Sequence, residues 1–163
     1  MDKERNYKQN TPERSYHVRM ASLSDLDAIA GIEQTCSSMP WHTDSLRYDL
    51  SDHNNAFYWV AELENTSKIV AYSACRHMVD DAEIMNIAVL PEWRRIGIAR
   101  QLLLIMESHA RQSGLEAMYL EVRESNSPAR QLYRESGYTE ITFRYQYYAN
   151  NRENAIIMSK NIS

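Results

Sequence analysis

The chain has 163 residues, of which 44% are hydrophobic and 25% charged, and its formal net charge is -4. This size and composition fit one domain with a packed core and a solvated surface. The acidic balance argues against nucleic acid as the main partner, because phosphate binding usually needs a basic surplus. No apolar run approaches the roughly 20 residues that cross a bilayer, and no signal-peptide pattern opens the chain. We therefore expect a cytoplasmic protein without a membrane partner.

The first 15 residues differ in composition from the rest of the chain. They lack hydrophobic periodicity and are rich in Lys, Arg, Glu and Asn, which is typical of a flexible polar leader. The periodic patterns begin at Tyr16 and continue to the end. The sequence therefore predicts a leader over residues 1–15 and a single domain over residues 16–163.

Hydrophobic periodicity predicts seven strands and four helices in that domain. The strands are expected over residues 16–20, 56–62, 68–78, 82–89, 118–122, 138–148 and 154–160. The helices are expected to start near Ser24 and Thr43 as N-caps, near Ala99, and at Ser127-Pro128. The order is strand, two helices, three strands, helix, strand, helix, two strands. It indicates an α/β fold in which helices cover the faces of a mixed sheet.

The segment from Asn86 to Ala99 joins an apolar strand to a helix through a turn that contains Arg94, Arg95 and Gly97. A helix N-terminus presents unpaired N–H groups and a partial positive charge, so it can hold a phosphate. The segment is neither a Walker loop, which needs Lys-Ser/Thr after the glycine, nor a three-glycine dinucleotide fingerprint. The turn is therefore a candidate phosphate site, and a plain turn with surface arginines is the alternative.

The pattern Arg94-x-x-Gly97-x-Ala99 after such a strand resembles the acetyl-coenzyme A signature of the GNAT acetyltransferases. Longer stretches are similar to the RimI-type ribosomal-protein alanine N-acetyltransferases of that superfamily. These stretches are 39–41, 86–89, 120–126, 132–133, 136–138, 144–148 and 155–158. The resemblance covers roughly residues 16–163 and is strongest from Ile84 onward. The leader and Leu90, which stands at an often acidic position, depart from the family pattern.

The resemblance implies the GNAT fold, a mixed, mostly antiparallel sheet of about seven strands that is splayed open between strands 4 and 5. Coenzyme A would lie in this opening, with pantetheine along the strand, the pyrophosphate on the turn and Asn126 near the next helix. The implied cofactor-binding residues are Ile87, Ala88, Val89, Arg94, Arg95, Ile96, Gly97, Ile98, Ala99, Arg100 and Asn126. Acetyl-coenzyme A is the expected cosubstrate, and no metal is expected.

Acetyl transfer to an amine needs a neutral amine, a stabilised oxyanion and a protonated leaving thiol. A free α-amino group has a pKa near 7.7–8.0, so a modest base suffices. By resemblance, Glu121 is the base, acting through water, and Tyr133 is the acid that protonates the thiolate. The N–H of Val89 is a candidate oxyanion donor. Without the family context, Glu121 could be a solvated strand-end carboxylate and Tyr133 a core aromatic.

A covalent cysteine route is the competing mechanism. Cys36 and Cys75 are the only cysteines in the chain, and the sequence predicts neither beside the cofactor turn nor next to a histidine. We therefore expect direct transfer in a ternary complex.

The acceptor groove is implied by two further segments of the resemblance. Met39, Pro40 and Trp41 lie between the first two helices, and Tyr147 and Tyr148 lie in the turn between the last two strands. The paired tyrosines resemble those that grip a peptide backbone, so the implied acceptor is the N-terminal alanine of the small-subunit ribosomal protein eighteen. The alternatives are a small amine such as a polyamine or aminoglycoside, a protein lysine, or a non-catalytic acetyl-coenzyme A sensor.

Overall fold

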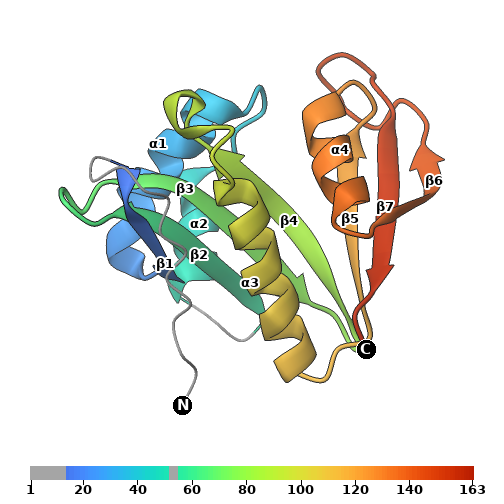
Figure 1. The fold of residues 1–163 in the computed structure, drawn as a ribbon. Helices are drawn as coiled ribbons and strands as arrows, with labels where there is room; N and C mark the ends of the chain where they lie inside the picture. The colour runs from blue at the N-terminus through green and yellow to red at the C-terminus, as the bar shows by residue number, and fades with distance from the viewer. Residues whose placement is uncertain (1–13, 52–54) are drawn as a thin grey trace.

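The computed structural model describes residues 14–51 and 55–163 (Figure 1). The helices are α1 (Leu26–Cys36), α2 (Thr43–Ser51), α3 (Ile98–Gln112) and α4 (Ser127–Glu135). The strands are β1 (Tyr16–Met20), β2 (Ala56–Leu63), β3 (Ile69–His77), β4 (Asp81–Val89), β5 (Ala117–Arg123), β6 (Thr139–Arg144) and β7 (Ala155–Asn161). The predicted order of elements is therefore confirmed within the described part of the chain.

All seven strands form one sheet in the order β1-β2-β3-β4-β5-β7-β6. Among the strands of the described residues only the β4–β5 pair is parallel, and it spans Asp81–Ile84 and Ala117–Leu120. Beyond Ile84 strand β4 continues to Val89 without pairing with β5, and the two ribbons diverge in Figure 1. The predicted splay between the fourth and fifth strands is thus confirmed.

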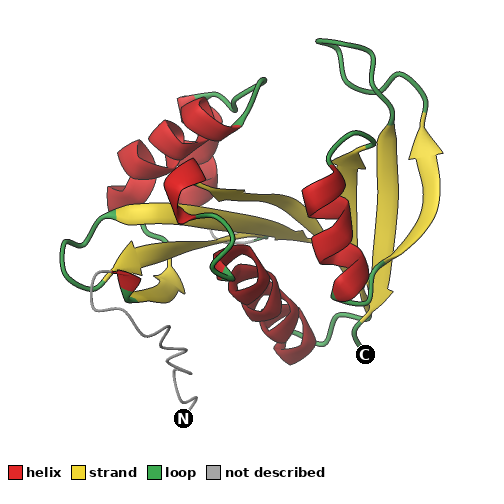
Figure 2. Cartoon of the chain, turned by 45° about the horizontal axis from the view of Figure 1, so that its top comes forward, coloured by secondary structure: helices red, strands yellow, loops and turns green. Residues whose placement is uncertain are grey.

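Helices cover both faces of the sheet (Figure 2). Buried residues of α1 and α2 pack with β2, β3 and β4 in one cluster, whereas α3 and Tyr133 of α4 pack on the other face. Along β5, Met118, Leu120 and Val122 are buried in the cluster with α3. Because side chains alternate along a strand, Glu121 points to the face that α1 and α2 cover on the other half of the sheet.

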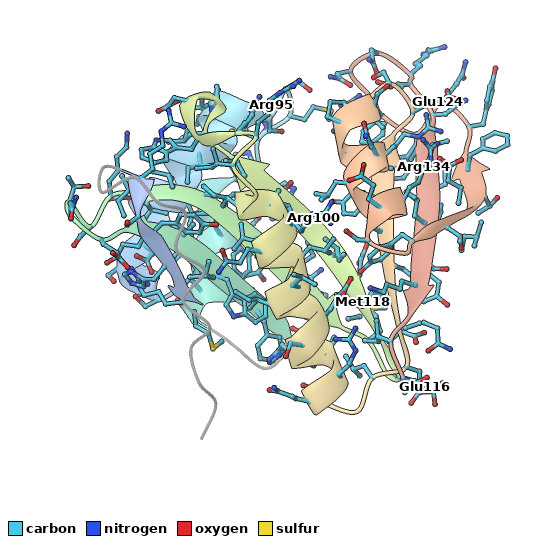
Figure 3. All side chains as sticks on the ribbon, viewed as in Figure 1. Arg95, Arg100, Glu116, Met118, Glu124 and Arg134 are labelled. Atoms are coloured by element: carbon cyan, nitrogen blue, oxygen red, sulfur yellow. The ribbon has the colours of Figure 1, made fainter. Side chains whose placement is uncertain are left out.

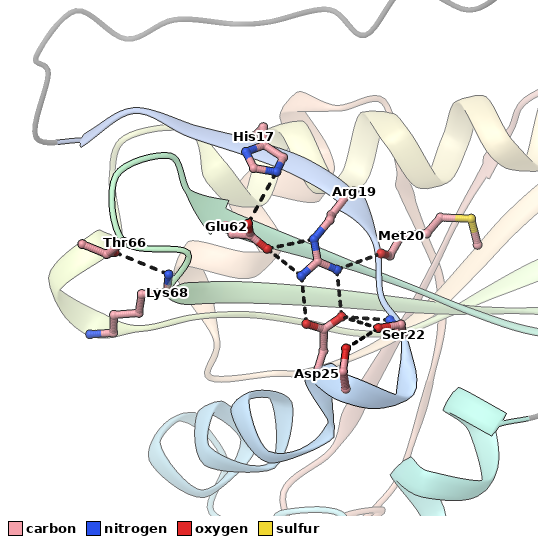
Figure 4. A network of polar contacts seen from close by, with 9 residues as sticks. His17, Arg19, Met20, Ser22, Asp25, Glu62, Thr66 and Lys68 are labelled. Carbon is pink, nitrogen blue, oxygen red and sulfur yellow. Dashed lines mark hydrogen bonds and ion pairs between the residues drawn. The ribbon is translucent and has the colours of Figure 1, made fainter.

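The turn between β1 and α1 is held by an ion-pair network (Figure 4). The guanidinium of Arg19 lies 2.8 Å from an Asp25 oxygen and 2.6 Å from a Glu62 oxygen, and Ser22 N–H donates to Asp25. These contacts form a short 3₁₀ turn (Leu23–Asp25), so the predicted N-cap at Ser24 is wrong and α1 begins at Leu26.

Two other predicted boundaries also need correction. Thr43 is the first residue of α2 rather than its cap, because the His42 carbonyl already accepts hydrogen bonds from the N–H groups of Ser45 and Leu46. The strand predicted over residues 138–148 ends at Arg144, since the chain then turns with Gln146 at a positive φ of 47°.

Most of the predicted leader lies outside the described residues. Of its last two members, Arg14 places its guanidinium over the Trp93 ring and Ser15 accepts a hydrogen bond from Glu64 N–H. No helix in the described ranges is long and apolar enough to cross a membrane.

His77 of β3 and His109 of α3 form a half-buried aromatic cluster with Phe57. The ring centroids of the two histidines lie 5.0 Å apart, and each lies 4.4 Å from the Phe57 ring. Neither Nε2 atom has a hydrogen-bond partner among the described residues. Burial lowers the pKa of both histidines, and the neighbouring His77 lowers that of His109 further.

This cluster should make the fold sensitive to acid. As the pH falls through about 6.5, the unfolded chain takes up protons that the folded chain resists, so the free energy of unfolding decreases. When the pH is lowered from 7.5 to 5.5, we expect the melting temperature of His109→Phe to fall less than that of the wild type. Melting temperatures measured at both pH values, with the exposed His42→Gln as control, would test this. An equal loss in all three proteins would contradict it.

Candidate functional site

The turn before α3 leaves backbone donors free at the helix N-terminus. Gly97 has a φ of 90°, and Arg95 has a φ of 64°, a left-handed conformation that non-glycine residues seldom adopt. The first helical bond runs from Gln101 N–H to the Gly97 carbonyl, and no described side chain caps the preceding N–H groups. The three donors of Ile98–Arg100 can therefore bind an anion. Figure 3 shows Arg95 at this turn and Arg100 on the first turn of α3.

Arg94 turns away from the helix N-terminus toward the end of β4. Its Nε donates to the Val89 carbonyl at 2.9 Å, and its Nη2 lies 3.7 Å from Cys36 Sγ. Cys36 Sγ itself lies 3.5 Å from the same carbonyl oxygen. The prediction that neither cysteine lies beside the cofactor turn is therefore wrong for Cys36. The sequence could not reveal this contact, because the end of α1 and the turn are more than 50 residues apart.

The exposed edge of β4 presents alternate backbone groups toward the splay. Leu90 N–H donates to Val70 on β3, and polar groups of successive residues in a strand point to opposite edges. The N–H groups of Val89 and Ile87 therefore face away from β3, toward the diverging β5, whereas those of Ala88 face β3. Two of the three predicted backbone positions are thus directed into the splay.

Two other predicted cofactor residues have partners within the fold. Arg100 Nη2 lies 2.8 Å from a carboxylate oxygen of Glu135 on α4, and both side chains are about half exposed. Asn126 is the N-cap of α4, because its side-chain oxygen accepts a hydrogen bond from Ala129 N–H at 3.3 Å. A ligand that enters the splay would therefore find Arg100 of α3 already paired with Glu135 of α4.

Glu121 lies in a cluster of polar groups on its face of β5. Its side chain is 24% exposed, and its Oε1 lies 3.1 Å from Arg144 Nε of β6. A hydrogen bond to Glu121 and partial burial raise the pKa of Tyr147. The guanidinium of Arg144 also lies 5.6 Å from the Tyr147 ring centre. Glu121 is therefore a half-buried carboxylate with a fixed orientation, not a freely solvated side chain.

Tyr133 is buried on α4, with 7% of its surface exposed, and its ring lies 5.7 Å edge-on from Tyr138. Burial and the nearby Tyr148 phenol raise the pKa of Tyr133. Burial, with Glu121 contributing, also raises the pKa of Tyr148, whose ring packs edge-on against Tyr147 at 5.2 Å. Tyr148 thus affects the pKa of Tyr133, and Glu121 affects the pKa of Tyr148, although the two predicted catalytic groups come from different elements.

The loop between α1 and α2 is fixed by a buried carboxylate. Glu33 is 1% exposed and accepts hydrogen bonds from the Tyr72 hydroxyl, the Asn86 amide and, at 3.0 Å, the Trp41 N–H. Among the predicted acceptor residues, Trp41 and Pro40 are half-buried while Met39 is 46% exposed. Glu33 therefore ties the predicted acceptor loop to β4 at Asn86, directly before the exposed strand edge.

Removing this carboxylate should destabilise the protein. Glu33→Leu would leave the buried Tyr72 hydroxyl and the part-buried Trp41 N–H without this acceptor, and Asn86 would keep only its hydrogen bond to Tyr72. We expect it to lower the free energy of unfolding by about 3 kcal/mol. Urea unfolding would measure the loss, with the exposed neighbour Gln34→Leu as control, for which the change should stay within about 0.5 kcal/mol. A loss for Glu33→Leu no larger than for the control would contradict the anchoring role.

The structure adds three residues that sequence reasoning missed, namely Glu33, Arg123 and Arg144. Each has partners on distant segments, and for Glu33 and Arg144 no local spacing could identify this role. Arg123 shares the face of β5 that carries Glu121, and its strand position could have revealed it by alternation.

Comparisons with known proteins agree with this geometry. A sequence model described as the acetyltransferase (GNAT) family matches residues 26–138. The ribosomal protein bS18-alanine N-acetyltransferase of Escherichia coli K12 is 34% identical over 148 residues, which cover 90% of this chain and 97% of the relative. The protein of the same name from Haemophilus influenzae is 32% identical over 145 residues, which cover 87% and 96%. The crystal structure of the ribosomal-protein-S18-alanine N-acetyltransferase from E. coli superposes with a TM-score of 0.82 at 31% identity, covering 91% of this chain and 94% of that one.

Proposed function

Because the chain belongs to the GNAT family of acetyltransferases, we propose that it acetylates the α-amino group of an N-terminal alanine, that of the small-subunit ribosomal protein eighteen. The names of relatives with 32–34% identity and nearly full coverage support this acceptor. The acidic net charge of -4 is compatible with a basic ribosomal peptide.

GNAT enzymes use acetyl-coenzyme A, and the free backbone donors fit this cosubstrate. The pyrophosphate would bind the uncapped N–H groups at the start of α3, with Arg95 and Arg100 supplying positive charge. Pantetheine would pair with the exposed edge of β4 at Ile87 and Val89. To reach the phosphates, Arg100 would exchange its Glu135 partner for the ligand.

The reaction in this proposal is direct transfer within a ternary complex. Glu121 takes the proton of the attacking amine through a water molecule as the C–N bond forms. The carbonyl oxygen gains charge that the Val89 N–H stabilises. The C–S bond then breaks, and Tyr133 donates a proton to the departing thiolate. Tyr133 regains a proton from solvent.

The observation that carries this proposal is the convergence of Glu121, Tyr133, Tyr147 and Tyr148 beside the diverging strands. They come from β5, α4 and the β6–β7 loop. The Tyr147 and Tyr148 rings pack edge-on at 5.2 Å, and Arg144 lies 3.1 Å from Glu121 and 5.6 Å from the Tyr147 ring centre. Tyr148 is also one cause of the raised pKa of Tyr133.

Thiol release from acetyl-coenzyme A with two acceptors tests the proposal. The first acceptor is a short peptide that begins Ala-Arg-Tyr, and the second is the same peptide with its N-terminus blocked. Turnover with the free N-terminus alone is the expected result. Equal turnover with both peptides, or turnover only with a polyamine or a lysine side chain, would overturn the proposed acceptor.

A further inference from the structure

Two loops that are distant in sequence meet beside the predicted acceptor groove. Residues 37–42 connect α1 with α2, and residues 145–154 connect β6 with β7. Asn150 Nδ2 of the second loop donates to Ser38 Oγ of the first at 3.2 Å, across 112 residues of sequence. Each loop carries part of the predicted acceptor site, Met39–Trp41 in one and Tyr147-Tyr148 in the other.

Arg123, the last residue of β5, lies under this contact. Its Nη2 lies 3.1 Å from Asn150 Oδ1, 3.5 Å from Ser38 Oγ and 3.9 Å from the Met39 sulfur. Its Nη1 lies 3.3 Å from a carboxylate oxygen of Glu153. One guanidinium therefore touches both loops at once, and its side chain is only 22% exposed.

Arg123 also fixes one of the predicted acceptor tyrosines. Its guanidinium carbon lies 3.8 Å from the centre of the Tyr148 ring, a distance at which a cation and an aromatic face attract each other. Arginine suits this position because its planar fork can stack on a ring and donate several hydrogen bonds in fixed directions. A lysine ammonium has neither property.

We propose that Arg123 is a positioning residue that joins loop 37–42 to loop 145–154 and so sets the width of the groove that grips the acceptor peptide. The identity of the acceptor in this inference rests on the proposed function. The bridge between the two loops does not depend on it. Arg123 lies two positions from Glu121 on the same face of β5, so the bridge would also place the acceptor next to the proposed base.

The bridge should affect binding more than folding. Most of its contacts involve exposed side chains in the two loops, and such contacts add little to overall stability. The α1–α2 loop is separately anchored by Glu33, and β5 is paired with β7 along its whole length. Loss of Arg123 should therefore free the loops relative to each other while the domain stays folded.

The test compares Arg123→Met and Arg123→Lys with Arg134→Met. Arg134 is a matched control, since it is an exposed arginine on α4 whose guanidinium pairs with Glu140, 2.6 Å away, and its side chain bonds to neither loop within the described residues. Hydrogen exchange of the full chain would be measured over residues 37–42 and 145–154, together with melting temperature and acetyl-coenzyme A affinity. Steady-state kinetics with the Ala-Arg-Tyr peptide would give the acceptor KM.

We expect Arg123→Met to speed exchange in both loops and to raise the peptide KM about tenfold, with kcat and cosubstrate affinity within about twofold of wild type. Arg123→Lys should resemble Arg123→Met, and Arg134→Met should resemble wild type. Wild-type behaviour of the lysine variant, faster exchange in only one loop or neither, or an unchanged peptide KM would overturn the bridge. Failure of the proposed function would show as a wild-type enzyme that does not turn over the peptide, and the exchange data would then decide the bridge alone.

Discussion

Replacing Tyr133 by Phe should lower kcat with the peptide acceptor by about 10²- to 10³-fold, the usual contribution of a positioned proton donor. Phe keeps the edge-on contact with Tyr138 and fills the same buried space, so packing should survive. Burial and the neighbouring Tyr148 raise the pKa of Tyr133 above its ordinary value of 10. The phenol therefore stays protonated throughout the neutral range and remains available as a donor to the leaving sulfur.

The measurement is kcat together with the affinity for acetyl-coenzyme A. The affinity should remain nearly unchanged, because the lost group acts on the thiolate that forms only during the reaction. Tyr138→Phe is the matched control, since Tyr138 is buried in the same aromatic contact but Tyr148 is not among the groups that shift its pKa. A variant Tyr133→Phe with normal turnover, or one that loses cosubstrate affinity instead, would show that Tyr133 is not the acid.

Much of the fold follows from local sequence patterns. Apolar residues at helical spacing predict α3, and its buried face contains Leu102, Leu103 and Met106 as periodicity requires. Boundaries are less predictable, because they depend on partners elsewhere. The start of α1 is set by Arg19 and its contact with Asp25, and no rule about Ser24 alone can include that ion pair.

The candidate site divides in the same way. The candidate phosphate-binding turn is contiguous, so Arg95 and Gly97 can be recognised from spacing, and their positive φ angles agree with an unusual turn. The environments of the proposed catalytic groups are not contiguous. Glu121 on β5 contacts Arg144 on β6, although β7 lies between these two strands in the sheet. The two residues are also far apart in sequence. Only folding brings these charges together.

That environment leads to the second large effect, which concerns Glu121. Glu121→Gln preserves shape and can still bind Tyr147, but it cannot accept a proton from the amine. We expect kcat/KM for the peptide to fall about 10²-fold at pH 7, where most α-amino groups of pKa 7.7–8.0 are protonated. The loss of kcat/KM relative to wild type should become smaller toward pH 9.5, because the α-amino group of the peptide is then already neutral and needs no base to deprotonate it.

The pH dependence separates this role from a purely structural one. Loss of the Arg144 contact would lower activity by a similar factor at every pH, whereas loss of a base is relieved as the amine deprotonates. Glu124→Gln is the control, since Glu124 lies just beyond β5, is exposed and bonds to Asn154 at 3.2 Å. If kcat/KM of Glu121→Gln is reduced by the same factor at every pH, Glu121 is not the base and serves only to anchor Arg144 and Tyr147. The proton would then have to leave the amine directly to water, and Tyr133 would be the one side chain that moves a proton in this site.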